Sequence, residues 1–117
     1  MVLMVTMQLV HSQWLLIKAG IKTIEIRLND TKRQALHVDE LVTFIDLATG
    51  QPLTTKIIRI ETYVDFESLL SQYTAIQVGS APETSVAQMV QEMQTLYSPA
   101  QVRQFGVVAL QLQPLIG

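Results

Sequence analysis

Five short runs of apolar and β-branched residues constrain the fold of this chain more than any other feature of the sequence. Such runs, bounded by turn signals, are typical of strands. In chain order they span residues 2–7, 22–28, 41–47, 53–64 and 107–112. Helical patterns fall between some of them but do not alternate with them regularly, so we expect an α+β fold rather than a doubly wound sheet. About five strands in so short a chain favour a small, partly open β-barrel with flanking helices, because closure removes open edges.

Capping and turn residues predict where the helices begin and end. Ser12 is the expected N-cap of the first helix, and Gly20 its stop. Asp30 is expected to cap a short helical turn. The longest helix is predicted over residues 83–97, where apolar residues recur at three- and four-residue spacing. A proline at its first position favours a further short helix over 98–106.

The length and the overall composition limit the class of protein. The chain has 117 residues, which fits one domain over 1–117. No apolar run approaches the ~18 residues that a membrane span needs. Cysteine is absent, which excludes disulfides and thiolate sites and fits a cytoplasmic protein.

Few cofactor or metal motifs are present. The glycine-rich motifs of P-loop and Rossmann nucleotide sites are missing from the sequence. His11 and His37 are the only histidines, and they are not at ligand spacing. We therefore expect neither a metal ion nor a cofactor.

The basic residues are concentrated in one segment. The net charge is −2, yet five of the eight basic residues fall within sixteen positions: Lys18, Lys22, Arg27, Lys32 and Arg33. That window holds only two acids, Glu25 and Asp30. A local positive patch on a mildly acidic body suits a specific anionic ligand. The alternative is a solvated face with ion pairs.

The strand predicted over residues 22–28 carries the candidate site. Ile24, Ile26 and Leu28 alternate onto one face, which belongs in the core, and Glu25 and Arg27 onto the other. Together with Lys22 these two charged residues make a credible ligand wall. Lysine and arginine can contact phosphate, and a carboxylate can act as a base or accept from an amine of a nucleobase. The alternative is an exposed strand face on which Glu25 pairs with Arg27.

The same segment resembles a known family. Residues 18–27, Lys-Ala-Gly-Ile-Lys-Thr-Ile-Glu-Ile-Arg, resemble the signature of the ASCH domain. Residues 29–33 are similar to its continuation in bacterial members, and residues 37–40, 97–98 and 106–110 are similar to later segments in the same order. The resemblance implies a PUA-like barrel with a cleft beside the lysine-containing strand. It also implies a role with RNA or modified nucleosides.

The leading hypothesis from this resemblance is a binding module for RNA or a nucleoside. Glu25 would then read a base or a sugar, and Tyr97 or Trp14 would stack on a base, although core packing is favoured for Trp14. The residues expected to contact phosphate are Lys22, Arg27, Lys32 and Arg33.

Two further hypotheses remain open. One branch of the family resembles small amidohydrolases acting on N4-acetylcytidine. Lys22 matches the motif lysine and Glu83 lies near the motif glutamate, but Glu25 stands where that branch has its threonine. An RNA-cleaving enzyme would need Lys22 and Glu25 to act as an acid–base pair. The third hypothesis is a structural or partner-binding domain, which the charged fraction of only 15% favours.

Overall fold

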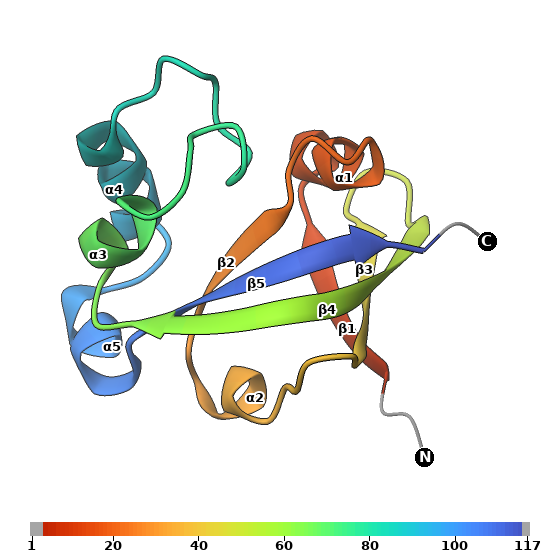
Figure 1. The fold of residues 1–117 in the computed structure, drawn as a ribbon, viewed down its shortest axis with the longest axis horizontal. Coiled ribbons are helices and arrows are strands. Elements are labelled where there is room, and N and C mark those ends of the chain that lie inside the picture. Colours follow the sequence, from red (N-terminus) through yellow and green to blue (C-terminus); the bar gives the residue numbers. More distant parts are fainter. Residues whose placement is uncertain (1–3, 116–117) are drawn as a thin grey trace.

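A computed structural model describes residues 4–115 of the chain (Figure 1). All five predicted strands are present, although residues 2 and 3 of the first predicted run lie outside the described range. The elements are β1 (Met4–Leu9), α1 (His11–Lys18), β2 (Ile24–Leu28), α2 (Thr31–Gln34), β3 (Leu41–Asp46), β4 (Pro52–Tyr63), α3 (Phe66–Leu70), α4 (Val86–Gln94), α5 (Pro99–Phe105) and β5 (Val107–Pro114).

The five strands form one mixed sheet in the order β1-β3-β4-β5-β2. Only β1 and β3 are parallel, and the other neighbours are antiparallel. The long strand β4 pairs with both β3 and β5, and its register with β5 shifts between Ile57 and Arg59. Such an irregularity bends a strand and increases its twist. The predicted α+β half-barrel is confirmed, with β1 and β2 as its two edge strands.

The helices form two sets around the sheet. In Figure 1, α3, α4 and α5 gather at the left, while α1 and α2 lie at the top and the bottom. Two hydrophobic clusters correspond to this division. One cluster fills the half-barrel and includes Trp14, Phe44 and Ile57. The other lies under α3 and α4 and includes Ile24, Leu69 and Met89.

Strand β5 joins the two clusters. Val108 and Leu110 belong to the half-barrel cluster, whereas Val107 and Ala109 belong to the other, because successive side chains point to opposite faces of a strand. All four are essentially inaccessible to solvent. Burying a large aliphatic side chain is worth about 1.5–3 kcal/mol, so β5 stabilises both halves of the core.

Trp14 is a core residue, as its apolar environment predicts. Its side chain is buried in the half-barrel cluster, and its indole Nε1 donates to the carbonyl oxygen of Phe44 at 3.0 Å. The hydrogen bond satisfies the only polar atom of the ring. Trp14 is therefore not a stacking surface for a ligand.

The helix ends agree with the sequence in most places. Gly20 has a φ of 76° just after α1, and the side chains of Asp30, Ser85 and Ser98 cap α2, α4 and α5. The predicted cap Ser12 is wrong. Helix α1 begins at His11, two residues before the start that a cap at Ser12 implies, and its N-cap is Val10, which makes no side-chain hydrogen bond. The predicted long helix over 83–97 shortens to α4, because Ser85 starts it and Gln94 ends it.

A buried carboxylate fixes the start of α1 against the β3–β4 turn. Asp46 is fully buried and accepts hydrogen bonds from the Ala48 amide, the Thr49 hydroxyl and His11 Nδ1, the last at 2.6 Å. Burial alone would raise the pKa of Asp46, but these donors outweigh it and hold the pKa below its ordinary value. Val10, just before α1, and Leu47, just after β3, both line the cavity described next.

Candidate functional site

The segment before β2 is held in place from two sides. The Lys22 amide donates to the carbonyl oxygen of Leu16 at the end of α1. The amides of Thr23 and Ile24 both donate to the carbonyl oxygen of Gln77, in the loop between α3 and α4. Gly20 permits the sharp turn that makes this possible, because its positive φ is costly for residues with a Cβ. Lys22 therefore enters the site from a rigid backbone.

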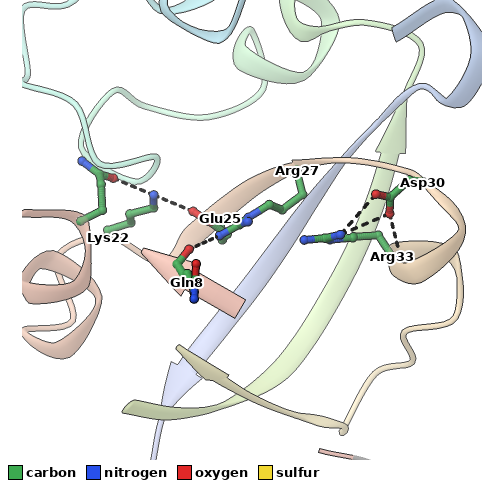
Figure 2. Close-up of polar contacts among 7 residues, drawn as sticks. Gln8, Lys22, Glu25, Arg27, Asp30 and Arg33 are labelled. Carbon is green, nitrogen blue, oxygen red and sulfur yellow. Dashed lines mark hydrogen bonds and ion pairs between the residues drawn. The ribbon is translucent and has the colours of Figure 1, made fainter. Parts of the chain in front are cut away.

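Lys22, Glu25 and Arg27 form a continuous chain of charges (Figure 2). Lys22 Nζ lies 2.7 Å from Glu25 Oε1, and Arg27 Nε lies 2.8 Å from Glu25 Oε2. Only 6% of the lysine side chain and 5% of the glutamate side chain are exposed. Arg27 is 17% exposed, and its Nη2 donates to the Gln8 carbonyl oxygen on β1. The polar face of β2 is thus largely buried rather than exposed to solvent.

The charge state of Glu25 follows from these neighbours. Burial on its own would raise the pKa of Glu25, because a carboxylate loses its hydration. The positive charges of Lys22 and Arg27, and their hydrogen bonds, outweigh this penalty and leave the pKa below its ordinary value of 4.5. Glu25 is therefore a carboxylate at neutral pH, and it acts only as a hydrogen-bond acceptor.

The three side chains line a cavity of about 490 Å³. Volumes of about 300–1,000 Å³ are typical of small-molecule sites. The wall opposite β2 comes from α4 and the residues after it, including Met93, Leu96 and Tyr97. The loop before α4 contributes Val78, Gly79 and Ser80. Most of the surface is apolar, with a smaller number of polar groups that include Lys22, Glu25 and Arg27, which is the usual composition of a site for a small organic ligand.

Gln13 links the lysine to the loop. Its side-chain oxygen accepts from Lys22 Nζ at 2.7 Å, and its amide nitrogen donates to the Gly79 carbonyl oxygen at 3.1 Å. Gly79 has a φ of 90°, and a Cβ there would lie 2.3 Å from Gln13 Oε1 and 2.7 Å from Lys22 Cδ. Glycine is therefore required both for the backbone conformation and for the close approach of the two side chains.

The other predicted site residues are placed differently. Tyr97 lines the cavity, and its ring stacks on Phe66 with centroids 5.9 Å apart. Within residues 4–115, Lys32, Arg33 and Glu83 do not line this cavity. Arg33 instead pairs with Asp30 at 3.2 Å, as Figure 2 shows at a distance from Glu25. Glu83 is exposed and lies in a separate groove beside α4.

The side chains that line the cavity limit the chemistry that this site can perform. The amidohydrolase pattern needs a hydroxyl at position 25, and Glu25 supplies none. Thr23, the nearest threonine in sequence, does not line the cavity in the described part of the chain. Among residues 4–115, no group of three histidine, aspartate or glutamate side chains could hold a metal ion.

Four polar cavity residues escaped the sequence interpretation: Gln8, Gln13, Ser80 and Glu92. Glu92 left a signal, because it lies three residues after Met89 and therefore on the same side of α4 as that buried side chain. Gln13 likewise lies four residues before the buried Ile17, and therefore on the same side of α1. The other two carry no pattern, since only the tertiary fold brings them to the cavity.

A half-barrel with a polar-walled cavity at one edge strand is a PUA-like architecture of the α+β class. The chain belongs to the ASCH domain family, whose sequence model matches residues 7–116. Two solved structures share its fold. The crystal structure of hypothetical protein PH0355 is 29% identical, with a TM-score of 0.85, and the match covers 97% of this chain and all of the other. The solution NMR structure of protein PF0455 from Pyrococcus furiosus is 26% identical, with a TM-score of 0.75, covering 98% of this chain and all of that one.

No curated protein matches the chain. Across residues 4–115, none of the helices has the length and apolar character needed to cross a membrane.

Proposed function

We propose that this chain binds a nucleobase in the cavity beside β2, either as an unpaired base of RNA or as a free nucleoside. The observation that carries the proposal is the burial of the Lys22–Glu25–Arg27 chain in the wall of a cavity of nucleoside size. Buried charges of this kind cost desolvation free energy, and their position in a cavity wall makes them candidates for a functional site. Membership of the ASCH family also supports a role in binding RNA.

The charges of the lining favour the base over the phosphate. Two cations, Lys22 and Arg27, face two acids, Glu25 and Glu92, so the lining carries no formal net charge. Both cations are already hydrogen-bonded to Glu25. A phosphate would have to compete with this carboxylate, whereas a neutral base needs only the remaining donors and acceptors. Lys32 and Arg33 carry no part of this role, because they lie outside the cavity.

The apolar surface suits a flat aromatic guest. Met93, Leu96 and Tyr97 present apolar area opposite the polar strand. Bases that are not stacked in a helix are commonly held between such side chains and read along their polar edges. Stacking on an aromatic side chain is worth about 1–3 kcal/mol per base. The lack of cysteine in the sequence fits our placement of this role in the cytoplasm.

Calorimetric titration of the four ordinary nucleosides and of a short single-stranded RNA tests the proposal. We expect at least one nucleoside to bind, and Lys22→Met to weaken it by about tenfold or more, as expected for loss of a hydrogen bond from a charged donor. Lys32→Met removes a lysine outside the cavity and serves as the matched control. Tighter binding of RNA than of the nucleoside would identify RNA as the source of the base. Absence of binding by any nucleoside or RNA contradicts the proposal.

A further inference from the structure

The polar wall of the cavity has a definite order of donors and acceptors. A lysine ammonium has three N–H donors, and Lys22 uses one on Glu25 and one on Gln13, which leaves one. Glu25 accepts one hydrogen bond on each carboxylate oxygen, and each oxygen can accept another. Arg27 uses Nε on Glu25 and one hydrogen of Nη2 on Gln8, and within residues 4–115 no partner is found for Nη1.

None of these groups can change its role at neutral pH. Lysine and arginine only donate. Glu25 stays a carboxylate, because both cations lower its pKa below the ordinary value, and so it only accepts. All three side chains line the cavity, with Lys22 just before β2 and Glu25 and Arg27 on it, and Figure 2 shows them in the order Lys22, Glu25, Arg27. The wall therefore presents a donor from Lys22, an acceptor from Glu25 and a donor from Arg27, in that order.

We propose that the cavity selects a uracil-type base, whose edge presents a carbonyl oxygen, an N–H and a second carbonyl oxygen. The N–H would donate to Glu25, and the two flanking carbonyls would accept from Lys22 and Arg27. This inference rests on the proposed nucleobase-binding function and adds the identity of the edge that is read.

Each of the other ordinary bases of RNA has one group on its edge that does not match the donors and acceptors of the wall. Cytosine and adenine present a bare ring nitrogen where Glu25 needs a donor, so two acceptors would face each other. Guanine has an N–H at the centre, but its exocyclic amine would face a cation instead of a carbonyl. A buried polar group left without a partner loses its hydration and gains nothing in return, and sites of this kind reject the wrong edge strongly.

Binding of uridine, 3-methyluridine and cytidine to the unmodified chain tests the inference. We expect uridine to bind at least about tenfold tighter than either of the others, because each of them removes the central N–H. 3-Methyluridine keeps both carbonyls and differs from uridine only at that position. Equal affinity for uridine and 3-methyluridine, or tighter binding of cytidine, overturns the inference while the nucleobase-binding function stands. If none of the three binds, the inference fails, and the nucleobase-binding function fails with it only if adenosine, guanosine and single-stranded RNA do not bind either.

A second variant tests the role of Glu25 directly. Glu25→Gln places an amide at the centre of the wall, and an amide can donate to the bare nitrogen of cytosine as well as accept. We expect the ratio of uridine to cytidine affinity to fall by about tenfold or more. Glu61→Gln, on β4 and outside the cavity lining, serves as the control and should leave the ratio unchanged. An unchanged ratio in a folded Glu25→Gln variant contradicts the assignment.

Discussion

Arg27 Nη2 donates a hydrogen bond of 2.9 Å to the main-chain carbonyl oxygen of Gln8. The two residues lie on β2 and β1, which are the opposite edges of the five-stranded sheet. Arg27 therefore spans the open side of the half-barrel and at the same time forms one end of the charged wall. An edge strand exposes unpaired main-chain groups, and this contact satisfies one of them. The Arg27 guanidinium thus contacts both the opposite edge of the sheet, at Gln8, and the carboxylate of Glu25 in the cavity wall.

Loss of the Arg27 side chain should destabilise the fold. Arg27→Met removes the link between β1 and β2 and one of the two cations beside Glu25. Hydrogen bonds to charged groups contribute about 1.5–3 kcal/mol each, so we expect a loss of about 2–3 kcal/mol in the free energy of unfolding, measured in urea. Arg59→Met removes an exposed arginine that pairs with Glu61 on β4 and should cost less than about 1 kcal/mol. Equal effects of the two variants would mean that the link contributes nothing.

The fold was more predictable from the sequence than the site. Runs of apolar and β-branched residues predict all five strands, and Gly20, Asp30 and Ser98 correctly mark the ends of helices. Ser12 misled, because a good capping residue was available one position inside a helix that started without a side-chain cap.

The site needed three-dimensional information that alternation along one strand does not contain. The pattern of β2 separates its two faces but does not indicate that the polar face is also covered, since the cover comes from α4 and the loop at Gly79. Arg33 shows that a sequence pattern can also suggest a site residue that the fold places elsewhere. Its position in the basic segment suggested a role in the site, yet a local ion pair with Asp30 holds it elsewhere.

Stability should depend on pH through Glu25. The unfolded carboxyl takes up its proton near the ordinary pKa of 4.5, whereas the folded carboxyl does so only at a lower pH. The stabilising contribution is therefore complete above pH 4.5 and is lost as the pH falls through the lowered pKa. We expect Glu25→Gln to cost about 3 kcal/mol at pH 7, because two cations lose their buried partner, and progressively less below pH 4.5.

Urea unfolding of both proteins between neutral and acidic pH measures this dependence. Glu67→Gln, which removes an exposed carboxylate from α3, controls for loss of a surface charge and should change the free energy of unfolding by about 0.5 kcal/mol or less. A cost of Glu25→Gln that stayed constant down to acidic pH would argue against a carboxylate stabilised by its two neighbours.

The close approach at Gly79 should matter for binding as well as for stability. Gly79→Ala strains a backbone with positive φ and displaces Gln13 and Lys22 from their mutual hydrogen bond. Gly50→Ala imposes a similar backbone strain, with nothing within 4 Å of its Cβ. Both variants should lose about 1–3 kcal/mol of stability. Only Gly79→Ala should also weaken uridine binding, and an equal loss of binding in the two variants would refute the role given to this contact.

Nucleoside binding should depend little on salt. The lining carries balanced formal charge, and its cations are paired within the wall. A neutral guest releases no condensed counterions, in contrast to a strand of phosphates. Repeating the uridine titration between low and high sodium chloride should therefore change the dissociation constant by less than about threefold, well below the effect of several phosphate contacts. A steep fall in affinity with salt would place an unrecognised anionic contact in the site.

The most direct test of the central claim is a ¹H–¹⁵N NMR titration of the isotope-labelled chain with uridine. If the base occupies the cavity, the largest shifts fall on amides around it, from Lys22 to Arg27, at Gly79 and Ser80, and at Tyr97. The amides of α2, including Lys32 and Arg33, should move little. Saturating shifts confined to α2 or to the outer residues of β4, with the amides of Lys22 to Arg27 unmoved, would contradict the account.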